Sequence, residues 1–457
     1  MEGPIGALYA KRDSGGFVEI PGGNGKPRPP VRRVAMLSVH TCPLATLGGK
    51  ETGGMNVYVR DLSREFGRRG ISVDVFTRSQ DPCVPHVNDT LGPNARVIHV
   101  PAGPEAPLPK GELQRYLPDF VAGVRAYAET EGITYDVLHS HYWLSGLAAY
   151  ALQQDGWRAP IVQMFHTLGE MKNRIAQTPA ERESEARIRG ECDIIGFADR
   201  LVAATAAEKA QLMWLYHAPA HLIRIVPPGV DLLRFHPIDA AVARAHVEVP
   251  PDHHLLLFVG RIEPLKGVET LLRAMALVAA DRPQWQPHTC PGMCLAIIGG
   301  SPDAVQDSEM GRLMTLRREL GLDEMVTFLG ARDQDTLQYY YSAADVVIMP
   351  SHYESFGMVA LEAMACGTPV IASEVGGLAF LVKHGRTGFH VPDREPRQLA
   401  DRILALINDP ALRSRLGAQA REYAQAYSWT NIADQILDVY AEVAGTGMAE
   451  QASVSAR

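Results

Sequence analysis

Short apolar segments alternate with longer amphipathic segments along most of this 457-residue chain, and that alternation limits the possible folds more than any other feature. The short segments are almost continuously apolar, which is typical of strands buried on both faces in a parallel sheet covered by helices. The expected strands are 33–38, 72–77, 96–100, 137–140, 160–165, 200–204, 223–226, 255–259, 294–298, 326–329, 346–349, 369–372 and 388–391. The expected helices include 56–69, 112–129, 206–216, 267–280, 310–320, 336–343 and 396–407.

The pattern restarts within the chain, because an apolar strand followed by a glycine turn occurs near residue 34 and again near residue 255. A chain of this length also exceeds one ordinary hydrophobic core. The sequence therefore predicts an α/β protein made of two doubly wound, Rossmann-like domains that face each other across a cleft. Ligands of such sheets bind beyond the carboxyl ends of the strands, so the cleft is the expected site.

The join between the domains is expected where prolines and a glycine fix a bend, from residue 226 to about residue 237. Residues 428–444 are expected to form a last helix that packs into the core, because their apolar residues have helical spacing. The remaining boundaries are a disordered N-terminal tail over 1–30, an N-terminal domain over 31–236, a C-terminal domain over 237–427 and a flexible tail over 445–457.

Composition narrows the class of partner. The net charge is −8, whereas a nucleic-acid-binding protein normally carries a basic field, so a small-molecule partner is expected instead of nucleic acid. No apolar stretch reaches about 18 residues and no signal peptide is recognised, so no membrane association is predicted. The six scattered cysteines favour reduced thiols in the cytoplasm. Cys290 and Cys294 with His288 could hold a metal, but a plain loop is the favoured interpretation.

The segment from Glu354 to Glu362 carries most of the functional signal, because it joins two carboxylates to the start of a helix at Gly357. Free backbone N–H groups at a helix start attract phosphate. A carboxylate just before the helix can accept hydrogen bonds from sugar hydroxyls, and a second one two turns further on can bind a ribose. A nucleotide-sugar needs these three contacts together, so the segment predicts a nucleotide-sugar site.

Other candidate contacts also follow expected strands. Arg261 and Lys266 stand at a strand end before a helix, where a planar fork and a point charge together suit a diphosphate. The glycine turn 53–56 precedes a helix, which favours an anion or sugar contact over a simple helix cap. His166 and Tyr142 also follow strands, and each could equally be structural.

Several alternative chemistries lack their motifs. We find no Gly-x-x-x-x-Gly-Lys-Ser/Thr loop, no Gly-x-Ser-x-Gly elbow and no His-Glu-x-x-His pair. An Asp-x-Asp pair placed to hold a metal and a diphosphate is also missing, since Asp333 and Asp335 head a helix, where capping explains them. The sequence therefore predicts that no cofactor is required, and it leaves open whether a magnesium ion assists.

Taken together, these motifs resemble the retaining GT-B glycosyltransferases of the large family that includes sucrose-phosphate synthase, over about residues 31 to 445. Within that family the chain is most similar to the mycothiol-pathway enzymes that transfer N-acetylglucosamine from UDP to inositol phosphate. The stretches that carry this likeness are 38–44, 139–146 and 179–187. The resemblance also implies that the C-terminal helix 428–444 crosses back onto the first domain.

The resemblance assigns roles residue by residue. It implies that the Gly54 N–H, Arg261 and Lys266 hold the donor diphosphate, and that Glu362 binds the ribose. The implied catalytic residues are His166, Arg261, Lys266 and Glu354. The implied donor-binding residues are Gly54, Arg261, Lys266, Glu354, Ser355, Phe356, Gly357, Met358, Val359 and Glu362. The implied acceptor-binding residues are Asn56, Lys110, Tyr142, Thr167 and Arg187, which suit a phosphomonoester.

The expected reaction is retaining transfer of a hexose or N-acetylhexosamine from a nucleotide-sugar, with UDP favoured, to a small phosphorylated acceptor of the inositol phosphate kind. Two departures from the family pattern, at Gly169–Glu170 and in the loop 47–52, flank the acceptor or the transferred sugar. They keep open a transfer to fructose 6-phosphate, as in sucrose-phosphate synthase. A nucleotide-sugar epimerase and a non-catalytic nucleotide-sugar sensor are the remaining alternatives, and a homodimer is left open.

Overall fold

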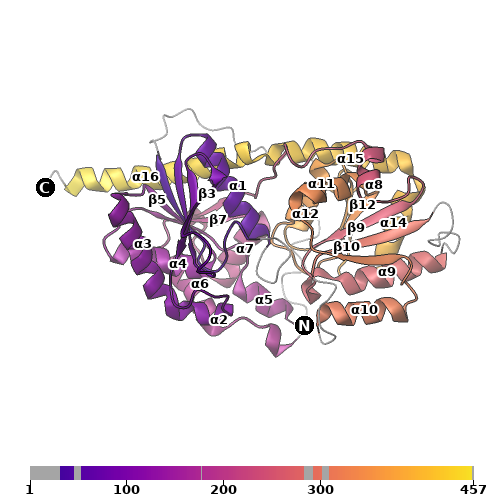
Figure 1. The fold of residues 1–457 in the computed structure, drawn as a ribbon, viewed down its shortest axis with the longest axis horizontal. Coiled ribbons are helices and arrows are strands. Elements are labelled where there is room, and N and C mark those ends of the chain that lie inside the picture. The colour runs from indigo at the N-terminus through magenta and orange to yellow at the C-terminus, as the bar shows by residue number, and fades with distance from the viewer. Residues whose placement is uncertain (1–30, 46–52, 177, 282–291, 301–307, 455–457) are drawn as a thin grey trace.

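The computed structural model describes residues 31–45, 53–176, 178–281, 292–300 and 308–454. The expected N-terminal tail 1–30, the loop 47–52 and the Cys290 and His288 positions of the metal alternative lie outside these residues. Two sheets organise the described chain, one in each half, and Figure 1 shows the two units side by side. Both are dominated by parallel strands, which confirms the predicted α/β class.

The first sheet has the strand order β3-β4-β2-β1-β5-β6-β7-β8. Every pairing in it is parallel except that of β3 with β4. Its strands are β1 (Arg33–Leu37), β2 (Ser72–Arg78), β3 (Val87–Gly92), β4 (Ala95–Val100), β5 (Val137–His141), β6 (Ile161–Met164), β7 (Arg200–Ala203) and β8 (Ile223–Ile225). Its helices are α1 (Gly54–Arg68), α2 (Lys110–Leu113), α3 (Leu117–Glu131), α4 (Trp143–Gln154), α5 (Gly169–Ile175), α6 (Glu185–Phe197) and α7 (Ala206–Leu215).

The second sheet has the order β11-β10-β9-β12-β13-β14 and is parallel throughout. Its strands are β9 (His254–Val259), β10 (Met293–Ile298), β11 (Val326–Gly330), β12 (Val346–Met349), β13 (Val370–Ser373) and β14 (Gly388–Val391). The helices in this half are α8 (Ala240–His246), α9 (Val268–Asp281), α10 (Glu309–Glu319), α11 (Gln334–Ala343), α12 (Met358–Ala365), α13 (Leu378–Leu381), α14 (Pro396–Asn408) and α15 (Pro410–Ala424).

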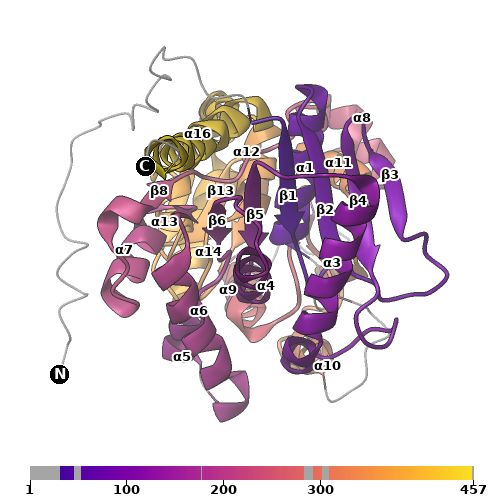
Figure 2. The same cartoon turned by 90° about the vertical axis from the view of Figure 1, so that its left-hand side faces the viewer.

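Alternation along the central strands explains the layers. In β1, Val34 and Met36 face one core cluster while Ala35 and Leu37 face another, so helices cover both faces. Residues of α1 belong to the first cluster, and residues of α3 and α4 belong to the second. Figure 2 shows these helices on either side of the sheet. The first cluster also contains residues of β9, α11 and α12, so one continuous apolar core joins the two units.

The strand β3 was not predicted from the sequence. Its residues, Val-Asn-Asp-Thr-Leu-Gly, are mostly exposed, and only Leu91 is buried. An antiparallel edge strand with one partner can leave its polar side chains in water, so it lacks the apolar signature of the inner strands.

The last helix, α16 (Trp429–Val454), lies along the first unit and appears in yellow in Figure 1. Its contacts fix that position: the Tyr440 hydroxyl lies 2.7 Å from Nδ1 of His139 in β5, and Arg69, just after α1, lies 2.9 Å from Asp434. The helix continues to Val454, whereas the sequence predicts its end at residue 444. The glycines at 445 and 447 suggested a stop, but glycine costs only about 1 kcal/mol inside a helix.

Among the helices of the described residues, none combines the length with the apolar character that a membrane crossing requires.

The packing of α16 is tested by shortening Ile436, which is completely buried. We expect Ile436→Ala to lower the free energy of unfolding by about 2–5 kcal/mol, because the cavity cannot close fully. Ile436→Val is the matched control and should cost only about 0.5–1.5 kcal/mol. Urea unfolding followed by circular dichroism measures both. Equal, small losses for the two variants would contradict this packing.

Candidate active site

The second unit places two cations at the end of its central strand β9. Lys266 lies at the end of the short 3-10 helix Pro264–Lys266, and its Nζ is 2.5 Å from Oε2 of Glu354. The guanidinium of Arg261 is 2.9 Å from Glu263. Lys266 and Glu354 are largely shielded from solvent, so their ion pair is stronger than an exposed pair. The structure thus brings together one expected diphosphate ligand and the expected sugar-binding carboxylate.

The segment before α12 is held in one conformation. Gly357, where the helix begins, has φ 107°, and a Cβ there would lie 2.6 Å from a Leu378 methyl group, so a larger residue does not fit. The Gly377 N–H donates to the Glu354 carbonyl over 2.8 Å. No side chain within the described parts of the chain caps the start of α12, and the first N–H groups of a helix have no partner inside the helix. This arrangement suits an anion.

Glu362 lies inside α12 and is buried. Its two oxygens accept from the Tyr341 hydroxyl over 2.8 Å and from the Gln334 side-chain amide over 3.2 Å. Burial raises the pKa of the Glu362 carboxyl to about 7. The oxygen of the same Gln334 amide accepts from Arg60 of α1 over 2.5 Å. Gln334 therefore links the expected ribose ligand to the opposite unit, a link that the sequence did not reveal.

The glycine turn before α1 faces the cations of the second unit. A Cβ on Gly53 would lie 3.9 Å from Nε of Arg261, and one on Gly54 would lie 3.3 Å from Cγ of Met358 at the start of α12. The carboxyl-terminal edges of the two sheets therefore meet here. Tyr353, next to Glu354, adds a further contact between the units, because its hydroxyl lies 3.4 Å from Oε1 of Gln211 in α7.

Asn56 serves the structure of this turn. Its amide nitrogen donates to the Thr41 hydroxyl and to the Cys42 carbonyl, each over 2.7 Å. Its oxygen accepts from the Gly53 N–H over 3.0 Å. Both amide protons are therefore engaged within the chain, so Asn56 can offer an acceptor ring only the remaining lone pair of its oxygen.

Three histidines lie together in β5 and just after β6, where His139 and His141 are completely buried and His166 is partly exposed. Nε2 of His166 lies 3.0 Å from Nδ1 of His141, and the ring of His139 stacks obliquely on that of His141 at 4.3 Å. Burial lowers the pKa of His166 and of His139 to about 3, and that of His141 well below its ordinary value. At neutral pH these imidazoles are therefore uncharged. His166 also has φ 61°, a left-handed backbone conformation that is uncommon for residues other than glycine and that is found more often at functional sites.

The expected acceptor residues converge on the ring of Tyr142. The guanidinium of Arg187 lies 4.7 Å from its centroid and the ammonium of Lys110 lies 5.8 Å from it. Arg187 also donates to the hydroxyl of Thr167 over 3.0 Å. The four residues come from α2, from the ends of β5 and β6, and from α6. The structure therefore brings these four side chains together.

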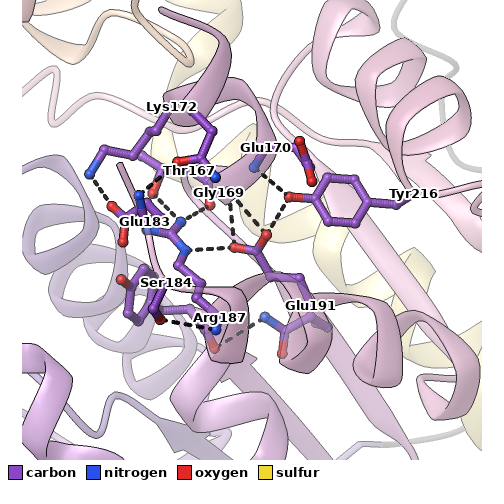
Figure 3. Close-up of polar contacts among 12 residues, drawn as sticks. Thr167, Gly169, Glu170, Lys172, Glu183, Ser184, Arg187, Glu191 and Tyr216 are labelled. Carbon is purple, nitrogen blue, oxygen red and sulfur yellow. Dashed lines mark hydrogen bonds and ion pairs between the residues drawn. The ribbon is translucent and has the colours of Figure 1, made fainter. Parts of the chain in front are cut away.

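A wider polar network supports Arg187 (Figure 3). Its Nε donates over 2.8 Å to Glu191, which is fully buried and also accepts from the Tyr216 hydroxyl and the Gly169 N–H. A Cβ at Gly169 would lie 2.6 Å from a methyl group of Ile188, so any larger residue here would have to move the Ile188 side chain aside where α5 approaches α6. The departure from the family pattern at this position has a local packing reason.

Sequence reasoning missed several of these polar partners. One signal was available in the sequence, because Glu183, Arg187 and Glu191 are each four residues apart. Side chains at this spacing can pair along a helix, and the last two lie in α6. The partners from distant parts of the chain had no sequence signal. The missed residues are Arg60, Lys172, Glu183, Glu191, Tyr216, Gln334 and Tyr341.

Within the described ranges, no group of three or more His, Cys, Asp or Glu side chains could hold a metal ion.

Comparisons with known proteins agree with this geometry. Residues 240–423 match the family model of glycosyl transferases group 1, and residues 52–234 match that of glycosyltransferase family 4. The D-inositol 3-phosphate glycosyltransferase of Saccharomonospora viridis is 43% identical over 412 residues, covering 90% of this chain and 94% of that protein. The enzyme of the same name from Geodermatophilus obscurus is 43% identical, with coverage of 92% and 91%.

Solved structures share the fold. The sucrose-phosphate synthase of Thermosynechococcus elongatus superposes with a TM-score of 0.82 at 38% identity, covering 91% of this chain and all of that one. Anabaena HepE in complex with UDP-glucose superposes with a TM-score of 0.68 at 21% identity, covering 90% and 99%. The predicted GT-B arrangement is therefore confirmed.

The buried histidines predict acid sensitivity. Folded His139 stays neutral down to about pH 3, whereas in the unfolded chain it takes up a proton below its ordinary pKa of 6.5. Its stabilising contribution is therefore complete above pH 6.5 and is lost as the pH falls, by up to about 1.4 kcal/mol per pH unit. We expect His139→Asn to reduce the slope of unfolding free energy against pH between 6.5 and 4.5, measured by urea denaturation.

Glu208 provides the opposite control. Burial raises the pKa of its carboxyl to about 7 from 4.5, so it favours the folded state increasingly as the pH falls through that range. Glu208→Gln removes this compensation and should make the wild-type loss of stability at acid pH steeper. Unchanged slopes in both variants would show that these groups titrate alike in the folded and unfolded chain.

Proposed function

This chain belongs to the glycosyltransferase family of the relatives described above, and we propose that it transfers a hexose or N-acetylhexosamine from a nucleotide-sugar to a hydroxyl of a small phosphorylated acceptor. UDP is the proposed nucleotide, and an inositol phosphate is the proposed kind of acceptor, as in the names of the relatives at 43% identity. The observation that carries the proposal is the meeting of the glycine turn with Arg261 and Met358. It puts the groups suited to a diphosphate and those suited to a phosphate monoester at facing sheet edges.

The donor half of the site is proposed from its charges. Arg261, Lys266 and the start of α12 hold the diphosphate, and Glu354 holds hydroxyls of the sugar while it pairs with Lys266. Glu362 receives the ribose from within α12. Ser355 to Val359 present backbone groups, and the Gly54 N–H approaches the diphosphate from the opposite unit. These contacts need no metal ion, because two cations and a helix start already carry the compensating charge.

In the proposed reaction the bond between the anomeric carbon and the diphosphate oxygen breaks, and the acceptor oxygen bonds to the same face of that carbon. The acceptor's proton passes to the departing phosphate oxygen, so configuration is retained. Negative charge grows on the diphosphate, where Arg261 and Lys266 stabilise it. His166 is uncharged and can hydrogen-bond to the sugar beside the reacting carbon without opposing the positive character that develops there.

Transfer to fructose 6-phosphate is the second candidate function. The 38% identity to a sucrose-phosphate synthase over 91% of this chain favours it. Both acceptors carry a phosphate monoester, so the pocket around Tyr142 suits either. They differ in the hydroxyl presented to the donor.

A panel of donors and acceptors tests the proposal. Purified protein is incubated with UDP- and ADP-sugars and with inositol phosphate, fructose 6-phosphate or no acceptor, and the products are measured by mass and anomeric configuration. We expect a retained product with a phosphorylated acceptor only. Product from the donor alone would indicate an epimerase, and tight nucleotide binding without turnover would indicate a sensor. Light scattering on the same sample determines whether the chain is a monomer or a homodimer.

A cytoplasmic location is part of the proposal. Free thiols at Cys42, Cys83, Cys192, Cys294 and Cys366 support it, because reduced cysteines are usual where glutathione and thioredoxin operate.

The role of Lys266 gives a quantitative prediction. We expect Lys266→Ala to lower kcat by about 10²–10³, which is about 2.7–4 kcal/mol, because one preorganised donor to the leaving diphosphate is lost. Lys383→Ala is the control, since that ammonium lies over the Tyr423 ring, apart from the cations of the cleft. Steady-state kinetics with saturating acceptor measures both. Wild-type turnover of Lys266→Ala would remove this residue from the mechanism.

A further inference from the structure

Two cations of the first unit converge on one carboxylate oxygen. Oε1 of Glu183 lies 2.9 Å from Nη1 of Arg187 and also contacts the ammonium of Lys172, which extends from α5 (Figure 3). Arg187 is a proposed phosphate ligand, whereas neither the sequence motifs nor the resemblance gave Lys172 or Glu183 a role. Two cations around a single oxygen can hold a phosphate oxygen as well as a carboxylate oxygen, because charge-assisted hydrogen bonds to either anion are strong.

Arg187 pairs with two carboxylates, those of Glu183 and Glu191, and their other contacts show which of the two can move away. Glu191 is completely buried and accepts from two further groups besides Arg187, the Gly169 N–H and the Tyr216 hydroxyl. If the Glu191 carboxylate moved away, those buried donors would lose their hydrogen-bond acceptor and would have no water to replace it. The side chain of Glu183 is 22% exposed, and among the residues that the structure describes its carboxylate pairs with Lys172 and Arg187 alone. Glu183 can therefore turn toward solvent at lower cost.

The backbone at Glu183 stays in place when the side chain turns. Its N–H donates over 2.7 Å to the side-chain oxygen of Asn173 in α5, and the next residue, Ser184, caps α6 by accepting from the Arg187 N–H. Both anchors act on the main chain and neither uses the Glu183 carboxylate. Rotation about the side-chain bonds alone is enough to uncover Lys172 and Arg187.

We propose that Lys172 and Arg187 form an anion subsite for the acceptor's phosphate, and that Glu183 occupies this subsite until a dianionic acceptor displaces it. This rests on the proposed function, since it assigns the acceptor to the pocket around Tyr142. With Glu183 in place, the cations Lys172 and Arg187 face the two carboxylates of Glu183 and Glu191, so the charges of these four side chains balance. With Glu183 turned away, the four-residue group loses one negative charge at the subsite, and the net positive charge left there attracts a phosphate monoester.

Displacement makes the pocket selective for charge. A neutral polyol cannot compete with a carboxylate for two cations, whereas a phosphate dianion can, so Glu183 rejects acceptors that lack the phosphate. Burial raises the pKa of the Glu183 carboxyl, but Arg187 and Lys172 outweigh this and hold it below its usual value. The carboxylate therefore remains ionised and effective as a competitor at neutral pH.

The test compares Lys172→Met, Lys172→Arg and Glu183→Gln with the control Arg189→Gln. Arg189 is also on α6 but pairs with Glu185 on the exposed face, so it loses the same charge away from the pocket. We expect Lys172→Met to raise KM for the phosphorylated acceptor about tenfold or more, the scale of one charge-assisted hydrogen bond, with KM for the donor unchanged. Lys172→Arg should restore most of the affinity.

Glu183→Gln should act in the opposite direction. We expect a lower KM for the phosphorylated acceptor, stronger competitive inhibition by inorganic phosphate, and greater relative use of the dephosphorylated acceptor. A structural clasp between α5 and α6 would instead lower Tm and change KM for both acceptors equally. That result, or an unchanged phosphate inhibition constant in both Lys172→Met and Glu183→Gln, would overturn the proposal.

A binding measurement separates this proposal from the proposed function. Stabilisation of the protein by inorganic phosphate is followed as a shift in Tm, which requires neither turnover nor the right acceptor. We expect the shift to shrink in Lys172→Met and to grow in Glu183→Gln. Such shifts with no transfer to any acceptor would refute the proposed reaction and keep the anion subsite. Transfer by the wild type, with identical shifts in all variants, would refute the subsite alone.

Discussion

The polarity of the strands is the constraint on which the candidate site depends. In a parallel sheet all strands finish at the same edge, so residues far apart in the sequence arrive together there. His166 follows β6, Tyr142 follows β5, and Arg261 follows β9 in the other sheet. The common apolar core and the return of α16 hold the two edges against each other, as the approach of Gly53 to Arg261 shows. These three side chains are thus positioned by strands that are themselves buried for hydrophobic reasons.

Charge in the cleft follows a second rule, which is that a shielded cation needs a carboxylate. Lys266 pairs with Glu354, and Arg187 pairs with Glu191. The two pairs differ in how firmly the carboxylate is held in place. Glu191 is locked by several donors, whereas Glu354 lies next to Tyr353 at the boundary between the units, where an incoming donor can share it. The same chain therefore contains carboxylates that hold its cations in place and carboxylates that an anionic ligand can replace.

The sequence alone predicted the parts that depend on local pattern. The apolar strands, the restart of the pattern and the helix start at Gly357 were all readable, because burial on both faces and a left-handed turn leave local signatures. The edge strand β3 was not, since its side chains face water. Contacts such as that of Gln334 with Glu362 were also not predicted. They join side chains of different elements, and the periodicity of the sequence carries no information on side-chain geometry. The close approach of Ile188 to Gly169 likewise had no signal in the sequence.

A charged residue and an uncharged one, Arg187 and His166, are both neighbours of Thr167. Arg187 stays charged although it is almost inaccessible, because two carboxylates and the Tyr142 ring surround it. His166, one residue from Thr167, has no such partner among the carboxylates described here, and burial lowers its pKa to about 3. A cation is useful where phosphate is bound, and it would be harmful beside a carbon that gains positive character. The two neighbouring positions therefore differ in charge because an arginine with carboxylate partners stays protonated, whereas a histidine without such a partner loses its proton when it is shielded from water.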